Sequence, residues 1–207
     1  MHTFPQRRYD DPGAYMADYA ALTAAGWRSV DPAQLSYASD VLLTAYRQKQ
    51  QVFVCGNGGS ATISAHFECD HLKGVHRDTG LSPRVRTLSG NLGLLTAIAN
   101  DFSYDDVFAF PLARLADPGD VLVAISSSGN SPNIIKAIEE ANVRGLTTVA
   151  FTGFDGGRAR QLARICVHVD VHNYGVVEDI HQGLMHVLGQ YIRQSRMSAD
   201  RIPEVRF

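Results

Sequence analysis

The sequence predicts an α/β fold in which a parallel sheet is covered by helices on both faces. Two observations predict it. Short apolar segments such as "QVFVC" (51–55) and "DVLVAIS" (120–126) are continuous rather than alternating, which is typical of strands buried on both faces. Segments with helical spacing separate them, as in the βαβ units of parallel sheets. With 207 residues, the chain is long enough to bury a full core as one medium-sized domain.

The elements follow one another in a regular order. Strands are expected at 51–55, 84–89, 120–126, 147–153 and 164–171. Helices are expected at 14–27, 31–50, 59–74, 91–101, 104–116, 131–145, 157–163 and from about 177 to 196. The second helix has a clear start, because Asp31 is a favourable N-cap and Pro32 suits the first helical position. At least one helix therefore separates each strand from the next.

The chain is expected to divide into three parts. Residues 1–39 form an N-terminal helical segment without a glycine-rich loop or a metal-like cluster, so we expect it to serve in packing or oligomer formation. Residues 40–197 form the α/β domain. Residues 198–207, "SADRIPEVRF", form a C-terminal tail to which the sequence assigns no role.

Composition argues against several classes of protein. The net charge is −2 and the pI is near 6.4, so the chain lacks the clustered positive charge on which non-specific nucleic-acid binding rests. The longest apolar runs are too short to span a bilayer, and the N-terminus lacks the apolar core of a signal peptide. The three cysteines are scattered and odd in number, unlike a disulfide framework. We therefore expect a cytoplasmic protein that binds neither a membrane nor nucleic acid directly.

Two strand ends carry loops suited to a phosphate. "VCGNGGSA" (54–61) offers glycines whose backbone can approach an anion closely, and Ser60 near a helix start. "AISSSGNSPN" (124–133) offers the hydroxyls of Ser126, Ser127, Ser128 and Ser131 before a further helix. Neither loop is a dinucleotide fingerprint or a Walker A sequence, and either alone is equally well explained as a strand–helix turn. Because ligands bind beyond the carboxyl ends of parallel strands, the two loops together favour a phosphorylated ligand.

A second group of residues favours metal or acid–base chemistry. His66 and Asp70 are four residues apart on one helix, which places them on one face. Such a pair alone is more often a surface ion pair. The closing helix adds Glu178, Asp179, His181 and His186 to an otherwise apolar segment. His181 is also open to the simpler interpretation of a residue on the polar face.

Five segments in this order and spacing resemble the sugar isomerase (SIS) domain, and more narrowly the phosphoheptose isomerase family: "CGNGGSA", "ANDFSYDDVF", "SSSGNSPN", "TGFDGG" and "VEDIHQGLMHVL". The resemblance covers about residues 40–195. It implies a three-layer α/β/α, flavodoxin-like doubly wound fold, and a homotetramer with active sites at subunit interfaces. We expect the N-terminal helices in the tetramer core. The resemblance also implies sugar-phosphate contacts from Asn57, Gly58, Gly59, Asn100, Asp101 and the four loop serines, and we add Ser60.

The implied reaction converts sedoheptulose 7-phosphate to D-glycero-D-manno-heptose 7-phosphate through an enediol, with metal assistance. The family holds one zinc ion by a His and a Glu four residues apart, and by a Gln and a His eight residues apart. The matching residues here are His66, Asp70, Glu178 and His186. Two of them depart from the family, since Asp70 replaces Glu and Glu178 replaces Gln. Carboxylate oxygens also bind zinc, so the four-ligand set stays possible.

The resemblance implies proton transfer by Asp70 and His186. Asp is one methylene shorter than Glu, and a displacement of about 1 Å can cost about a hundredfold in rate. Two interpretations stay open: Glu178 shares the role of base, or the preferred sugar differs.

Two other functions stay as alternatives. Related SIS tetramers associate with a bacterial replication initiator and bind a protein rather than turning over a sugar. Sugar-phosphate sensors also use this domain, usually fused to a DNA-binding domain, but the N-terminal helices here show no basic recognition helix. The set of His66, Asp70, Glu178 and His186 favours the enzyme, because an adaptor has no need of it.

Overall fold

A parallel sheet forms the middle of the structure, a computed structural model that describes residues 4–207. Its strands are β1 (Gln51–Gly56), β2 (Arg84–Thr87), β3 (Val121–Ser126), β4 (Thr147–Thr152) and β5 (Ile165–His168). They pair in the order β2-β1-β3-β4-β5, and every neighbouring pair is parallel. This is the flavodoxin-like order, and it confirms the predicted fold class.

The direction of strand order reverses between β1 and β3. The chain leaves β1, reaches β2 at one edge, and returns to β3 on the other side of β1. In the register of this pair, Gly56 lies beside Ile125, so both strands end at the same level. The loops that follow β1 and β3 therefore lie side by side, at the switch point where open α/β sheets bind their ligands.

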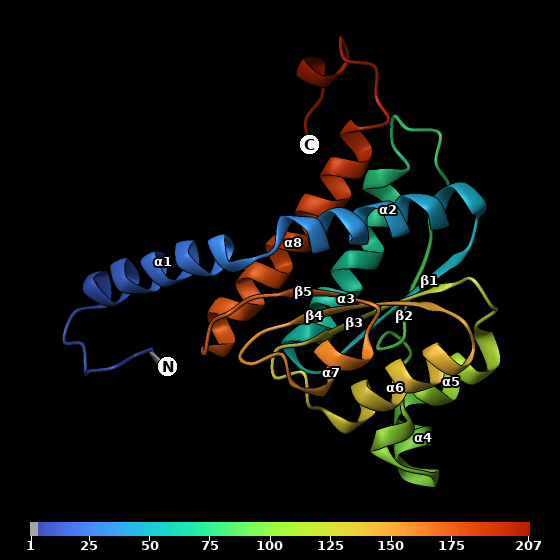
Figure 1. Cartoon of the computed structure of the whole chain (residues 1–207), viewed down its shortest axis with the longest axis horizontal. Coiled ribbons are helices and arrows are strands. Elements are labelled where there is room, and N and C mark those ends of the chain that lie inside the picture. The colour runs from blue at the N-terminus through green and yellow to red at the C-terminus, as the bar shows by residue number, and fades with distance from the viewer. Residues whose placement is uncertain (1–3) are drawn as a thin grey trace.

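Helices cover both faces of the sheet (Figure 1). On one face lie α2 (Pro32–Gln48), α3 (Gly59–Cys69) and α8 (Tyr174–Gln194), while α1 (Pro12–Ser29) packs on α8 and extends past the sheet. On the other face lie α4 (Leu92–Asp101), α5 (Ala109–Leu115), α6 (Pro132–Val143) and α7 (Gly157–Leu162). A π-helical turn (Asp70–Val75) continues α3, and short 3₁₀ turns lie at Tyr104–Asp106 and Ile202–Glu204.

The strands contribute side chains to two separate cores. Val52 and Val54 of β1 join the cluster under α2, α3 and α8, whereas Phe53 and Cys55 join the cluster under α5 and α6. Successive side chains of a strand point to opposite faces, so a sheet covered twice needs apolar residues at every position. This requirement explains the continuous apolar runs in the sequence.

Three helices differ from their predicted bounds by more than two residues. The helix expected at 59–74 changes at Asp70 into the π-helical turn. The helix expected at 104–116 is divided into the 3₁₀ turn and α5. The closing helix begins at Tyr174, earlier than expected, because the Asn173 side chain caps it by accepting a hydrogen bond from the N–H of Val176 at 3.0 Å.

The predicted boundary at 39/40 falls inside α2, and α2 residues on both sides of it, Ala38 and Leu42, are buried in the core. The three-part division, including the tail at 198–207, stays a prediction. Within residues 4–207, no helix combines the length and apolar character that crossing a membrane requires.

His181 is fully buried on α8 rather than placed on its polar face. Its ring lies beside that of Phe151, with centroids 5.8 Å apart. Burial lowers the pKa of His181 to about 4, and the nearby carbonyl of Thr152 offsets this only in part. The imidazole is therefore neutral in the folded protein at neutral pH.

We predict that His181 makes the fold sensitive to mild acid. An imidazole in the unfolded chain has a pKa of about 6.5, so the unfolded state takes up the proton first as pH falls. The stability that His181 contributes is complete above about pH 6.5 and is lost toward about pH 4, by roughly 3 kcal/mol in total. His181→Met should flatten this fall in urea titrations across the acid range. His76→Gln, at an exposed histidine, is the control and should keep the wild-type fall. An equally steep fall in both variants would contradict the prediction.

Candidate active site

A cavity of about 150 Å³ lies where β1 and β3 end. Both predicted phosphate loops and the start of α8 form its walls. Its polar lining residues are Asn57, Ser60, Ser126, Ser127, Ser128, Ser131 and Glu178. The loops therefore meet in space as the sequence predicts, although β2 lies between them in the chain.

Two of the three long helices that begin at this cavity, α3 and α6, lack a side-chain cap. The N-cap is Gly58 at α3 and Ser131 at α6, and neither helix start has a side-chain capping bond. The other helices of eight or more residues in the described part of the chain are capped, by Asp11, Asp31, Asn91 and Asn173. The first-turn N–H groups of α3 and α6 thus lack a side-chain acceptor at the helix ends where the dipole favours an anion.

Gly58 and Gly59 of "CGNGGSA" occupy their positions for different structural reasons. Gly58 has a φ of +53°, in the left-handed region that other residues rarely adopt. Gly59 leaves room for the carboxylate of Glu178, because a Cβ atom there would force that side chain to move. The loop is therefore fitted to the start of α8 as well as to a ligand.

The Ser127 hydroxyl indicates a ligand most directly. Ser127 lines the cavity, and its Oγ is buried without a hydrogen-bond partner. Buried polar side-chain atoms nearly always have a partner, and one left without it is costly. An oxygen of a bound phosphate would satisfy this hydroxyl.

Asn57 ties the two loops together. Its side-chain amide pairs with that of Asn133, with N–O distances of 2.8 and 2.9 Å, and the hydroxyl of Tyr104 donates to its Oδ1 at 3.1 Å. Asn133 is buried on α6 and was not among the site residues predicted from the sequence. This pair fixes the spacing of the loops around the cavity.

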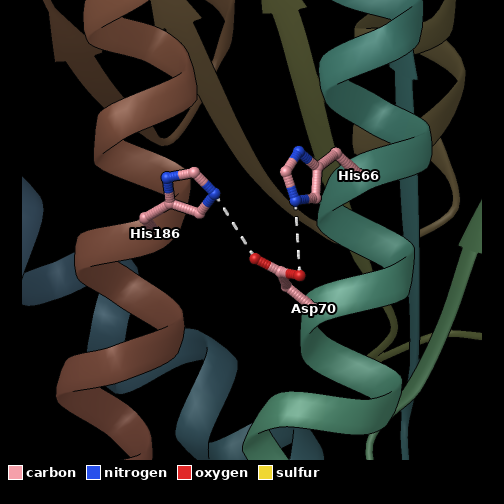
Figure 2. Close-up of side chains that lie close together, drawn as sticks. All are labelled: His66, Asp70 and His186. Carbon is pink, nitrogen blue, oxygen red and sulfur yellow. Dashed lines mark ion pairs between the residues drawn. The ribbon is translucent and has the colours of Figure 1, made fainter. Parts of the chain in front are cut away.

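Farther along α3 and α8, the structure brings His66, Asp70 and His186 together (Figure 2). The Nε2 atom of His66 lies 3.4 Å from Asp70 Oδ1, and that of His186 lies 3.5 Å from Asp70 Oδ2. One ligand atom from each residue lies within 4.8 Å of the others. Two imidazoles and a carboxylate at this spacing form a possible metal-binding group. All three side chains keep contact with solvent, so a substrate can reach them.

Glu178, the fourth predicted ligand, lies outside this group. Its carboxylate packs against Gly59 at the serine-lined cavity, where burial and then the neighbouring Asp179 raise its pKa. Gln182, one turn farther along α8, has its amide nitrogen 2.9 Å from His66 Nδ1 and 3.2 Å from His186 Nε2. Gln182 was not among the ligands predicted from the sequence, although its spacing of four residues from His186 was a usable signal.

Asp70 is held at the start of the π-helical turn by buried aromatic contacts. The next residue, His71, is fully buried, stacks on Phe67 with centroids 3.9 Å apart, and shares a hydrogen bond of 2.6 Å with the hydroxyl of Tyr46. Burial lowers the pKa of His71 to about 3, so its ring is neutral. Because His71 is fixed in the core, Asp70 is fixed on the adjacent, solvent-facing side.

Asn100 and Asp101 lie apart from the cavity. Both are exposed at the end of α4, and the amide of Asn100 donates to Asp101 at 2.8 Å. Their predicted contact with the sugar phosphate stays a prediction.

Comparison with known proteins places the chain in a family. The SIS domain matches residues 14–153. A phosphoheptose isomerase of Alteromonas mediterranea is 37% identical over 172 residues, which cover 82% of this chain and 86% of the relative. The chain belongs to the phosphoheptose isomerase family of SIS domains. A member from Mycobacterium tuberculosis is 37% identical over 159 residues, covering 75% of this chain and 79% of the relative.

Solved structures of the family agree with this placement. A phosphoheptose isomerase from Francisella tularensis superposes with a TM-score of 0.81 at 27% identity, over 88% of this chain and 96% of that one. The sugar isomerase domain of a transcription factor from Sphaerobacter thermophilus superposes at 0.63, but at 17% identity it shows the fold alone. The family assignment therefore favours the isomerase over the sensor and adaptor alternatives.

We predict that Tyr46→Phe destabilises the fold by about 1–3 kcal/mol, because it leaves the buried Nδ1 of His71 without its partner while keeping the ring. Urea titration measures the change. Tyr37→Phe is the matched control, since Tyr37 lies on the same helix with 56% of its surface exposed. Equal stabilities of the two variants would show that the Tyr46–His71 bond does not support the turn that carries Asp70.

Proposed function

We propose that this phosphoheptose isomerase relative converts sedoheptulose 7-phosphate to D-glycero-D-manno-heptose 7-phosphate through an enediol. One observation carries the proposal: a phosphate-suited cavity and an acid–base group lie along the same pair of helices. His66 lies six residues beyond Ser60 on α3, or about 9 Å, and His186 lies eight beyond Glu178 on α8, or about 12 Å. An extended seven-carbon sugar phosphate suits this separation, because its reacting carbons lie at the end away from the phosphate.

The phosphate occupies the serine-lined cavity in this proposal. Ser127 donates its unpaired hydroxyl, and the N–H groups at the starts of α3 and α6 supply further donors. Glu178 at the same cavity adds a negative charge near the phosphate. Burial raises the pKa of Glu178, and the repulsion disappears when its carboxyl group is protonated.

The proton transfers fall to Asp70 and His186. One side chain takes a proton from C1 of the ketose, the resulting enediol keeps both electrons, and the proton is returned at C2 to give the aldose. The other side chain moves the proton between the two oxygens. Both side chains face the same point between α3 and α8, which this exchange requires (Figure 2).

The same residues fit a divalent metal ion, and zinc suits two imidazoles and a carboxylate. We propose His66, Asp70 and His186 as the ligands, with the amide of Gln182 rather than Glu178 as the fourth group. A bound ion supplies Lewis acidity toward the sugar carbonyl.

We also propose that the enzyme is a cytoplasmic homotetramer with sites at subunit interfaces. The exposed apolar side chains of α1 and α2, such as Met16 at 67% and Tyr37 at 56%, supply surface for such contacts. The three cysteines are free thiols, in keeping with a reducing compartment.

We predict that Ser127→Ala raises the Michaelis constant for sedoheptulose 7-phosphate. A lost hydrogen bond to a charged group costs about 1.5–3 kcal/mol, which corresponds to roughly 10- to 150-fold. Ser36→Ala, at an exposed serine of α2, is the control. An unchanged constant in Ser127→Ala would place the phosphate elsewhere.

We predict that His186→Ala loses both zinc and isomerisation, whereas Glu178→Gln keeps its zinc. The reason is the position of each side chain, since only the histidine belongs to the three-residue group. Elemental analysis of purified variants measures the metal, with His76→Ala as a control for an exposed histidine. Loss of zinc from Glu178→Gln would return Glu178 to the ligand set, and zinc retained by His186→Ala would refute the site.

A further inference from the structure

A second cavity, of about 140 Å³, lies on the other side of the acid–base group. Asp70 and His186 form one wall, and Arg193 and Phe207 contribute to the rest. Along α8 the order is Glu178 at the serine-lined cavity, then His186, then Arg193 at this second cavity. The second cavity therefore adjoins the end of the site that is farthest from the phosphate loops.

The wall that contains Phe207 comes from the C-terminal tail, which turns back beside the end of α8 (Figure 1). Arg193 holds it there: this side chain donates to the carbonyl of Arg206 at 3.0 Å, and its guanidinium lies 4.8 Å from the centre of the Phe207 ring. It also donates to Asp78 at 2.8 Å. Arg193 is only 6% exposed, and a charged side chain so well buried needs such partners.

The position of this wall matters for the reaction proposed above. Once a base has removed the proton from C1, that proton either returns at C2 or exchanges with water that reaches the base. Water in contact with Asp70 or His186 on the side away from the phosphate promotes exchange and loss of the intermediate. An aromatic ring at that side of the cavity displaces water.

We propose that the C-terminal tail is the end wall of the active site, in which Arg193 and Phe207 are positioning residues that keep water from the acid–base pair on the side away from the phosphate. This inference rests on the proposed isomerase function. It gives residues 198–207 a role that neither the sequence nor the family relationship assigns.

The test is isomerisation of sedoheptulose 7-phosphate in D₂O, with the deuterium content of the aldose product measured by mass spectrometry at low conversion. Phe207→Ala should raise the deuterium content several-fold and lower kcat, while KM stays near its wild-type value because the phosphate contacts are distant. Phe207→Leu, which keeps an apolar cover, should restore low deuterium content. Glu204→Ala is the control within the same tail, because Glu204 does not line the cavity.

The outcomes separate the two proposals. If the wild type turns over the sugar and its aldose product contains as much deuterium as that of Phe207→Ala, the end wall alone is overturned. Complete exchange in the wild-type product would overturn it too. A wild-type protein that does not turn over the sugar overturns the isomerase function, and the end wall with it. Phe207 is 48% exposed, so its replacement should leave the fold intact.

Discussion

The parallel pairing of β1 with β3 is the constraint on which the rest of the site depends. With Gly56 beside Ile125, both strands end at one level, and the chain must leave each of them at the same place. One exit leads to α3 and the other to α6, on opposite faces of the sheet. The starts of both helices therefore converge on one cavity. A different strand order would separate the two loops, and neither alone would surround an anion.

A second consequence follows from the direction of α3 and α8. Both helices start at the serine-lined cavity and run away from it, so residues at similar distances from their starts face each other. Gly59 meets Glu178, Asp70 meets His186, and the π-helical turn lies near the region of Arg193. This arrangement places the serine-lined cavity, the group of His66, Asp70 and His186, and the second cavity one after another along the two helices.

The strands and both loops were predictable, because burial on two faces demands continuous apolar runs and because glycines and serines collect where strands end. The grouping of His66 with His186 followed from the family resemblance. The position of Glu178 outside this group did not follow from the resemblance, because a residue's place in a helix does not reveal how that helix is rotated against its neighbour. One turn separates Glu178 from Gln182, and that turn decides which of them meets the histidines. The position of the tail depends on Arg193, which contacts Arg206 and Asp78, 13 and 115 residues away, and no local sequence pattern predicts these contacts.

The replacement of the family's Glu by Asp70 has a structural answer. Here α3 gives way at Asp70 to a π-helical turn, a feature that is frequent at functional sites. His71 anchors that turn in the core, and both Asp70 oxygens then face an imidazole, at 3.4 and 3.5 Å. The backbone thus brings the short carboxylate between the two histidines, so that its position, rather than its length, decides whether it can serve in proton transfer.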